Sequence, residues 1–143
     1  MAKTYSVHRS IHASPERVWG LLTDPDGYTR WNPAVVSLEG HIAPGETIKL
    51  VSAVSPKRTF SLSVTELEPE RRMVWSDGMP LGLFKGVRTF GLRSLADGRT
   101  EFSMEETYTG ALAGLITRAI PDLTESFGQF ADGLKTASET APV

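Results

Sequence analysis

Apolar and polar residues alternate along most of the chain up to residue 110, and this pattern predicts β-strands. Over residues 3–12, Tyr5, Val7 and Ile11 share one parity while serine and histidine occupy the other. A period of two is typical of a strand with one buried face. Six further strands are predicted at residues 35–40, 46–54, 58–68, 71–77, 84–95 and 99–109. The short turns between them, such as Asp97-Gly98, favour antiparallel neighbours.

Two short helices are predicted between the first and second strands. Residues 14–16 (SPE) form a typical helix start. The serine can cap free N–H groups, the proline lacks an N–H that would stay unused, and the glutamate faces the positive end of the helix dipole. Residues 24–25 (DP) repeat this start for a second helix, which carries Tyr28 and Trp31 and ends at Pro33.

A change of period after residue 110 predicts a long helix at the carboxyl end. From residue 111 to about residue 138, apolar side chains recur at steps of three and four, which indicates one amphipathic helix. Such a helix would be about 40 Å long. Pro121 lies inside it, and we expect a kink there.

This order of elements predicts an α+β fold in a single domain that spans residues 1–143. Neither a linker nor an internal repeat interrupts the chain. An antiparallel sheet that curves around one long helix need not be filled in the middle, so a pocket between sheet and helix is expected.

Composition narrows the choice of partners. Fifteen basic and seventeen acidic residues give a formal net charge of −2, which argues against a nucleic-acid partner. The absence of cysteine excludes disulfides and a thiol nucleophile. No segment is long and apolar enough to span a membrane, and the first residues do not look like a secretory signal, so we expect a cytoplasmic protein.

The sequence gives no reason to expect a cofactor or a metal ion. His8 and His12 share the outer parity of the first strand, about 13 Å apart at the rise of a strand, which is too far for one metal. Motifs for zinc proteases, dinucleotides, nucleoside triphosphates and serine hydrolases are missing from the sequence.

Two charged residues fall on the apolar parity of neighbouring predicted strands. Arg88 belongs to the strand 84–95 and Glu106 to the strand 99–109, and the Asp97-Gly98 turn brings them nearly opposite each other. A lone buried charge is costly, whereas a pair costs less and fixes a geometry. We therefore expect these side chains to face each other at the wall of the pocket. Such a pair could hold a ligand's polar group, act as an acid/base pair, or be a plain salt bridge.

Several segments resemble the START-like, or SRPBCC, superfamily, and its polyketide cyclase/dehydrase-like branch most. They are residues 13–19 (ASPERVW), 22–25 (LTDP) and 28–33 (YTRWNP), with residues 64–69 and 97–110 in the predicted sheet. The resemblance implies a helix-grip fold, in which a curved seven-stranded antiparallel sheet wraps around a long carboxyl-terminal helix and encloses a hydrophobic cavity. Members include lipid-transfer domains, hormone receptors, aromatase/cyclases and activators of a chaperone ATPase.

The parity of the strands and the stripe of the last helix together predict a ligand site. Its candidate residues are Trp31, Phe60, Leu62, Trp75, Phe84, Arg88, Phe90, Met104, Glu106, Tyr108, Ile116, Ile120 and Leu123. Among them Glu106, Arg88 and Tyr108 are the candidates for catalysis, if there is any. Residues 77–86 (DGMPLGLFKG) are expected to form a loop that covers the mouth of the pocket as a lid, or a plain strand connection.

Three functions stay open at this point. The first is the binding of a small hydrophobic molecule, such as a lipid, a polyketide or an aromatic compound. The second is a cyclase or dehydratase with Glu106 or Tyr108 as acid/base and Arg88 opposite a developing enolate. The third is an interaction module like the chaperone activators, for which a mildly acidic carboxyl end is weak support. A homodimer through an exposed edge strand also stays open.

Overall fold

The computed structural model describes residues 3–119 and 121–140. Within them the chain forms one seven-stranded antiparallel sheet with the order β1-β7-β6-β5-β4-β3-β2. The strands are β1 (Lys3–Ile11), β2 (Val35–Glu39), β3 (Thr47–Ser52), β4 (Phe60–Glu68), β5 (Arg72–Met79), β6 (Phe84–Ser94) and β7 (Thr100–Thr109). The seven strands predicted from the alternation of apolar and polar residues are therefore present.

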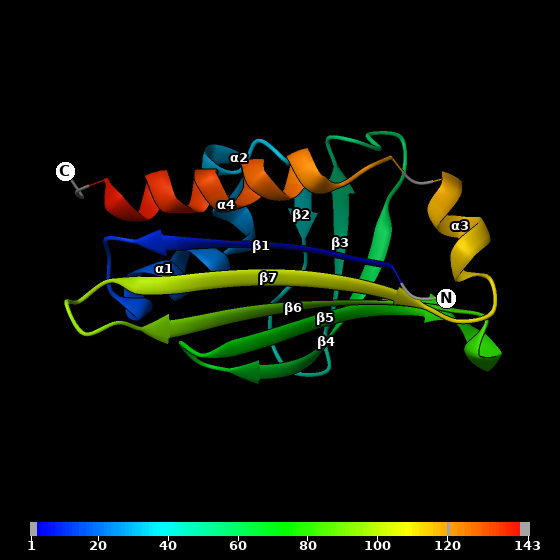
Figure 1. The fold of residues 1–143 in the computed structure, drawn as a ribbon, viewed down its shortest axis with the longest axis horizontal. Helices are drawn as coiled ribbons and strands as arrows, with labels where there is room; N and C mark the ends of the chain where they lie inside the picture. Colours follow the sequence, from blue (N-terminus) through cyan, green and yellow to red (C-terminus); the bar gives the residue numbers. More distant parts are fainter. Residues whose placement is uncertain (1–2, 120, 141–143) are drawn as a thin grey trace.

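The helices lie against one side of this sheet. They are α1 (Pro15–Leu22), α2 (Tyr28–Trp31), α3 (Ala113–Ala119) and α4 (Thr124–Glu139), with single 3-10 turns at Pro25–Gly27 (η1) and Pro80–Gly82 (η2). Figure 1 shows α4 running along β1, with α1 and α2 at the same end and α3 at the opposite end. None of the described helices combines the length and apolar character that crossing a membrane requires.

Helix α1 begins where the sequence predicts and also anchors the end of α4. Ser14 Oγ accepts a hydrogen bond from the backbone N–H of Arg17, which satisfies one of the free donors of the first turn. The Arg17 guanidinium then donates to the carbonyl oxygens of Ala137 and Ser138 at the end of α4. A cation at the negative end of a helix is stabilising, so this contact ties the two helices together.

Residues 111–138 were predicted to form one continuous helix, and this prediction is wrong because the helix is interrupted. The segment forms two helices, α3 and α4, and the chain is not helical from Pro121 to Leu123. Pro121 has no N–H to continue the helical ladder, and its ring clashes with the preceding turn. Asp122 Oδ1 then accepts the N–H of Thr124 at 2.9 Å, beside the start of α4. Ile120 lies outside the described residues.

The predicted loop at residues 77–86 is also much shorter than expected. Strand β5 continues to Met79 and β6 begins at Phe84, so only four residues connect them. Leu81 in this turn is 94% exposed. A lid would need its apolar side chains to pack over a pocket mouth, and the side chain at this tip faces solvent instead.

The core lies between the sheet and helices α1, α2 and α4. Phe130 of α4 is at its centre, with ring centroids 5.7 Å from Trp31, 5.9 Å from Phe90 and 6.4 Å from Phe102. Edge-to-face, tilted and stacked ring pairs at such separations stabilise a core by more than the burial of their apolar area alone. This half of the molecule is solid, so any cavity must lie nearer α3.

Helix α4 approaches α2 so closely that one residue has to be glycine. A Cβ at Gly133 would lie 2.2 Å from the carbonyl oxygen of Trp31, whereas a Cβ at Gly128 of the same helix would meet only Arg9, at 3.7 Å. Gly133→Ala is expected to lower the free energy of unfolding by about 1–3 kcal/mol, because the two helices must separate. Urea denaturation measures this change.

Gly128→Ala is the matched control, since alanine is the better helix former. It is expected to raise the free energy of unfolding by about 0.5–1 kcal/mol. Equal effects of the two substitutions would contradict the close approach of α4 to α2.

Candidate functional site

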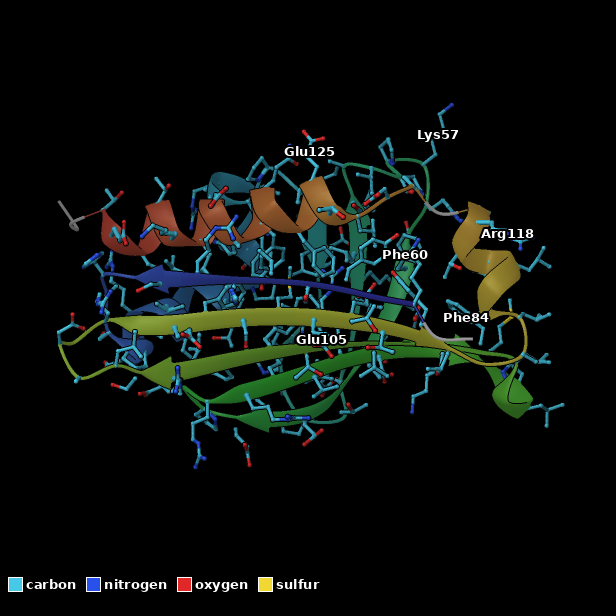
Figure 2. The ribbon with its side chains drawn as sticks, in the orientation of Figure 1. Lys57, Phe60, Phe84, Glu105, Arg118 and Glu125 are labelled. Carbon is cyan, nitrogen blue, oxygen red and sulfur yellow. The ribbon has the colours of Figure 1, made fainter. Side chains whose placement is uncertain are left out.

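A cavity of about 630 Å³ opens between the inner face of the sheet and the segment that contains α3. Strands β3 to β7 form one wall, and Ile116, Ala119 and Leu123 form the other. Phe60 and Phe84, which contribute apolar surface, lie at the end of the sheet nearest α3 (Figure 2). The break at Pro121 is what makes this wall, because it turns α3 away from the axis of α4.

Most of the residues predicted for a ligand site line this cavity. They are Phe60, Leu62, Trp75, Phe84, Arg88, Glu106, Tyr108, Ile116 and Leu123. The structure places three others, Trp31, Phe90 and Met104, in the core: Phe90 and Met104 are fully buried, and Trp31 packs on Tyr28 and Phe130. Ile120, the remaining candidate, is not among the described residues.

The two charged residues predicted to pair do so at the cavity wall. Arg88 and Glu106 are direct cross-strand partners, and Arg88 Nε donates to Glu106 Oε1 at 2.7 Å. Each side chain is only 13% exposed. The Tyr108 hydroxyl donates to Glu106 Oε2, so both carboxylate oxygens have a partner. The expectation that Arg88 and Glu106 face each other is therefore confirmed.

Aromatic rings fix the position of this polar group. The Arg88 guanidinium lies 4.9 Å from the centre of the Phe127 ring of α4, a favourable cation–π distance. Phe84 stacks on Tyr108 with centroids 5.7 Å apart. Burial, the nearby Glu106 carboxylate and the hydrogen bond to it raise the pKa of Tyr108 far above its ordinary value. Its hydroxyl therefore stays protonated and can only donate to Glu106.

Gly86 makes room for this arrangement. It is the cross-strand neighbour of both Asp77 and Tyr108. A Cβ at this position would lie 3.0 Å from Asp77 Oδ1 and 3.2 Å from the Tyr108 ring. The missing side chain lets a phenol and a carboxylate approach each other on the inner face of the sheet.

Asp77 is a cavity residue that the sequence reasoning missed. The predicted strand 71–77 ended at this residue and the predicted loop 77–86 began there, yet β5 extends past it and its side chain joins the cavity wall. Its parity with Met73 and Trp75, continued one step further along the strand, would have indicated this. Burial raises the pKa of Asp77, the Glu106 carboxylate adds to the rise, and the Arg88 guanidinium partly offsets it.

Chemically, the cavity combines apolar side chains with the polar group around Arg88 and Glu106, and Arg58 and serines of β3, β4 and β5 also line it. The apolar walls can take an oily molecule, and the guanidinium of Arg88 can meet an oxygen acceptor on it. In the described residues, His, Asp and Glu do not gather in groups of three that could hold a metal ion.

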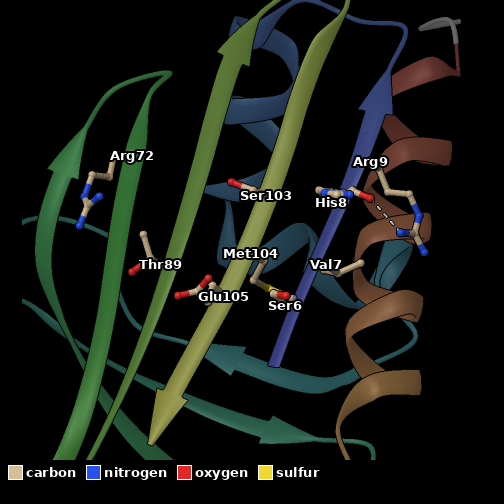
Figure 3. Close-up of a pocket in the computed structure, with 9 residues that line it drawn as sticks. All are labelled: Ser6, Val7, His8, Arg9, Arg72, Thr89, Ser103, Met104 and Glu105. Atoms are coloured by element: carbon tan, nitrogen blue, oxygen red, sulfur yellow. Dashed lines mark hydrogen bonds between the residues drawn. The ribbon is translucent and has the colours of Figure 1, made fainter. Parts of the chain in front are cut away.

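The outer face of the sheet carries a different kind of depression, of about 770 Å³. Figure 3 shows its polar lining, which includes His8, Arg72, Thr89, Ser103 and Glu105. It lies on the solvent side of β1, β5, β6 and β7, opposite the core. A polar surface of this kind does not suit a hydrophobic ligand, so the inner cavity is the better candidate site.

A curved seven-stranded antiparallel sheet with a carboxyl-terminal helix defines the helix-grip class of proteins. Residues 2–139 match the family described as polyketide cyclase/dehydrase and lipid transport, and the chain belongs to this family. The resemblance of its motifs to the SRPBCC superfamily and its polyketide cyclase/dehydrase-like branch is thereby confirmed.

Solved structures share the fold over nearly the whole chain. The Zhui aromatase/cyclase from Streptomyces sp. R1128 is 14% identical, covers 97% of this chain and 94% of its own, and has a TM-score of 0.76. Protein MLL2253 from Mesorhizobium loti is 22% identical, with 94% and 95% covered and a TM-score of 0.72. The Aha1 dimer from Colwellia psychrerythraea is 22% identical, with 96% of each chain covered and a TM-score of 0.72. No curated protein matches the chain.

The raised pKa of Asp77 predicts a pH-dependent gain in stability when its charge is removed. A carboxyl with a raised pKa binds a proton more readily in the folded protein, so its ionisation destabilises the fold as the pH rises. Asp77→Asn is therefore expected to increase the free energy of unfolding at pH 7. The gain should shrink as the pH falls below about 4, where Asp77 is protonated in both states.

Asp132 is the control of opposite sign. The hydrogen bond from Arg9 lowers the pKa of Asp132, so Asp132→Asn should destabilise the protein at pH 7 and have less effect in acid. Urea denaturation at pH 7 and at a pH below about 4 measures the change in the free energy of unfolding for both variants. A loss of stability for Asp77→Asn at pH 7 would show that its carboxylate is well solvated or well paired.

Proposed function

We propose that this chain binds a small hydrophobic molecule, a lipid, a polyketide or another aromatic compound, in the cavity beneath α3. The observation that carries the proposal is a cavity of about 630 Å³ whose lining is mostly apolar and includes the Arg88–Glu106 ion pair. A volume of this size is typical of sites for drug-sized ligands. Apolar lining with a few fixed polar groups is the usual composition of such sites.

The Arg88–Glu106 pair supplies the polar end of the proposed site. Arg88 uses Nε for Glu106, and among the described residues its two Nη groups make no hydrogen bond. They can donate to a carbonyl or hydroxyl oxygen of the ligand. The cavity lining holds two cations, Arg58 and Arg88, and two carboxylates, Asp77 and Glu106, so its formal charges balance. The oxygen that meets Arg88 can therefore belong to an uncharged group or to a carboxylate.

An enzyme of the cyclase or dehydratase type is the second candidate. It is favoured by the Glu106 carboxylate at the cavity wall, a candidate general base, which the Tyr108 hydroxyl and the Arg88 guanidinium hold in place. However, each oxygen of Glu106 already accepts a hydrogen bond, so a substrate proton would share an oxygen with Tyr108 or Arg88. Binding alone requires no proton transfer and is therefore the first candidate.

An interaction module is the third candidate, and it has the least support. The solved Aha1 structure is a dimer, but its identity to this chain shows the fold alone. Whether this chain forms homodimers stays a prediction that light scattering can test.

The first test is a thermal-shift screen with fatty acids, flavonoids and polyketide-like aromatic ketones. A ligand that binds the folded protein stabilises it by about 2.7 kcal/mol at a concentration of 100 Kd. We expect the melting temperature to rise by several degrees with at least one class. If no compound shifts it, the proposal fails.

A double variant that removes both charges of the Arg88–Glu106 pair tests whether this pair binds the polar group of the ligand. Arg88→Met combined with Glu106→Gln removes both charges without leaving either one buried alone. We expect about a tenfold loss of affinity for a ligand with a carbonyl group, which is the value of one hydrogen bond to a charged group. Affinity for a pure hydrocarbon should stay the same.

The matched control is a second arginine–glutamate pair on the same two strands. Arg93 and Glu101 are cross-strand partners of β6 and β7, and their side chains are 70% and 43% exposed. Arg93→Gln combined with Glu101→Gln should leave ligand binding unchanged. Equal losses in both double variants would mean that Arg88 and Glu106 act only through the fold. If a ligand is turned over, Glu106→Gln should abolish turnover while binding persists.

A further inference from the structure

The exposed apolar side chains of this protein gather at one end. Within the described residues, the large hydrophobic side chains that are exposed are Val36, Met79, Leu81, Leu83 and Leu115. All of them except Val36 belong to the end of β5, to the β5–β6 turn or to α3. Scattered exposed hydrophobic residues need no explanation, but a contiguous group of them marks a surface that meets something else.

The β5–β6 turn is bonded to the residues that lead directly into α3. The backbone N–H of Leu112 donates to the carbonyl oxygen of Leu83 at 2.8 Å, and that of Ala111 to Gly82 at 3.4 Å. Figure 1 shows this turn and α3 at the same end of the molecule, away from the carboxyl terminus of α4. We call the surface made by Met79, Leu81, Leu83 and Leu115 the apolar tip.

The conformation of Leu81 sets its side chain outward. Leu81 has φ of 62°, in the left-handed region that branched and bulky residues rarely adopt. The side chain is 94% exposed and makes no contribution to the core. Folding alone gives no reason for a leucine at this position, where glycine or asparagine would be less strained.

Basic side chains lie toward the same end of the molecule as the apolar tip. Lys57 in the β3–β4 connection, Lys85 at the start of β6 and Arg118 in α3 are all exposed. In the described part of the chain none of the three forms a salt bridge. Figure 2 shows Lys57 and Arg118 extending from this end. Acidic residues toward this end include Asp77 in the cavity wall and the exposed Asp122, which has Lys3 as a neighbour.

We propose that this end of the molecule docks on an anionic lipid surface. The apolar tip enters the boundary between headgroups and acyl chains, and Lys57, Lys85 and Arg118 contact lipid phosphates. Interfacial binding combines burial of apolar side chains with the attraction of cations to anionic lipids, and this end of the molecule presents both kinds of side chain. A protein partner would instead be expected to meet a broader patch.

The apolar tip lies next to the cavity, so docking would bring the cavity close to the lipid surface. Met79 is both half-exposed in the tip and part of the cavity lining, and Phe84 and Ile116 line the cavity directly behind it. A hydrophobic molecule could therefore pass between a bilayer and the cavity without crossing water. The docking itself does not depend on the proposed ligand, because it uses only the outer surface.

Co-sedimentation of the ligand-free protein with lipid vesicles tests this proposal. We expect binding to vesicles of mixed phosphatidylglycerol and phosphatidylcholine, weaker binding as salt is raised, and little binding to phosphatidylcholine alone. Leu81→Asp should reduce binding by about tenfold or more, since it removes an inserted leucine and adds a negative charge. Lys85→Gln and Arg118→Gln should each reduce it by about fivefold.

The controls use the same substitutions elsewhere. Val36→Asp changes an exposed hydrophobic residue of β2, outside the tip, and Arg71→Gln changes an exposed residue at the opposite end of β5. Both should bind vesicles like the unchanged protein, and circular dichroism checks that every variant is folded. The proposal is overturned if anionic vesicles do not bind the protein, or if the control variants lose as much binding as the tip variants. Absence of vesicle binding would not change the result of the thermal-shift screen, so the docking proposal and the ligand-binding proposal are tested separately.

Discussion

The register between β6 and β7 is the constraint on which the site depends. Gly98, with φ of 82°, and the hydrogen bond from the Arg99 N–H to Asp97 Oδ1 set the turn between these strands. Pairing of Ser94 with Thr100 then places Arg88 opposite Glu106 on the inner face. A slip of one residue would turn one of these charges toward the solvent side and leave the other buried alone, at a cost of several kcal/mol. The ion pair and the register therefore stabilise each other.

The hollow next to this pair results from the end of a helix rather than from the curvature of the sheet alone. Where α4 covers the sheet, Phe130 and its aromatic neighbours fill the space completely. Pro121 ends the helical segment, and α3 leaves the axis of α4 before the sheet ends (Figure 1). The uncovered part of the inner face becomes the cavity, and Phe84, Tyr108 and Arg88 lie on its wall.

The alternation of apolar and polar residues was enough to predict every strand and the pairing of Arg88 with Glu106, because register and face follow from a period of two. It did not predict the break in the last helix, because local periodicity continues across Pro121 and tertiary packing decides between a kink and an end. Asp77 was missed for a related reason: glycines after it suggested a loop, whereas pairing with β6 extends the strand. Parity also could not separate Phe90 in the solid core from Phe84 at the cavity, since both face inward.

The central claim is that an oily molecule occupies the inner cavity with its polar atom against Arg88. Intermolecular nuclear Overhauser effects in a saturated complex with an aromatic ketone measure this directly. The account predicts contacts from the ligand to the rings of Phe84 and Tyr108 and to the Ile116 methyl groups. Contacts confined to His8 and Thr89 on the outer face, or a complex without any contact to the inner face, would contradict it.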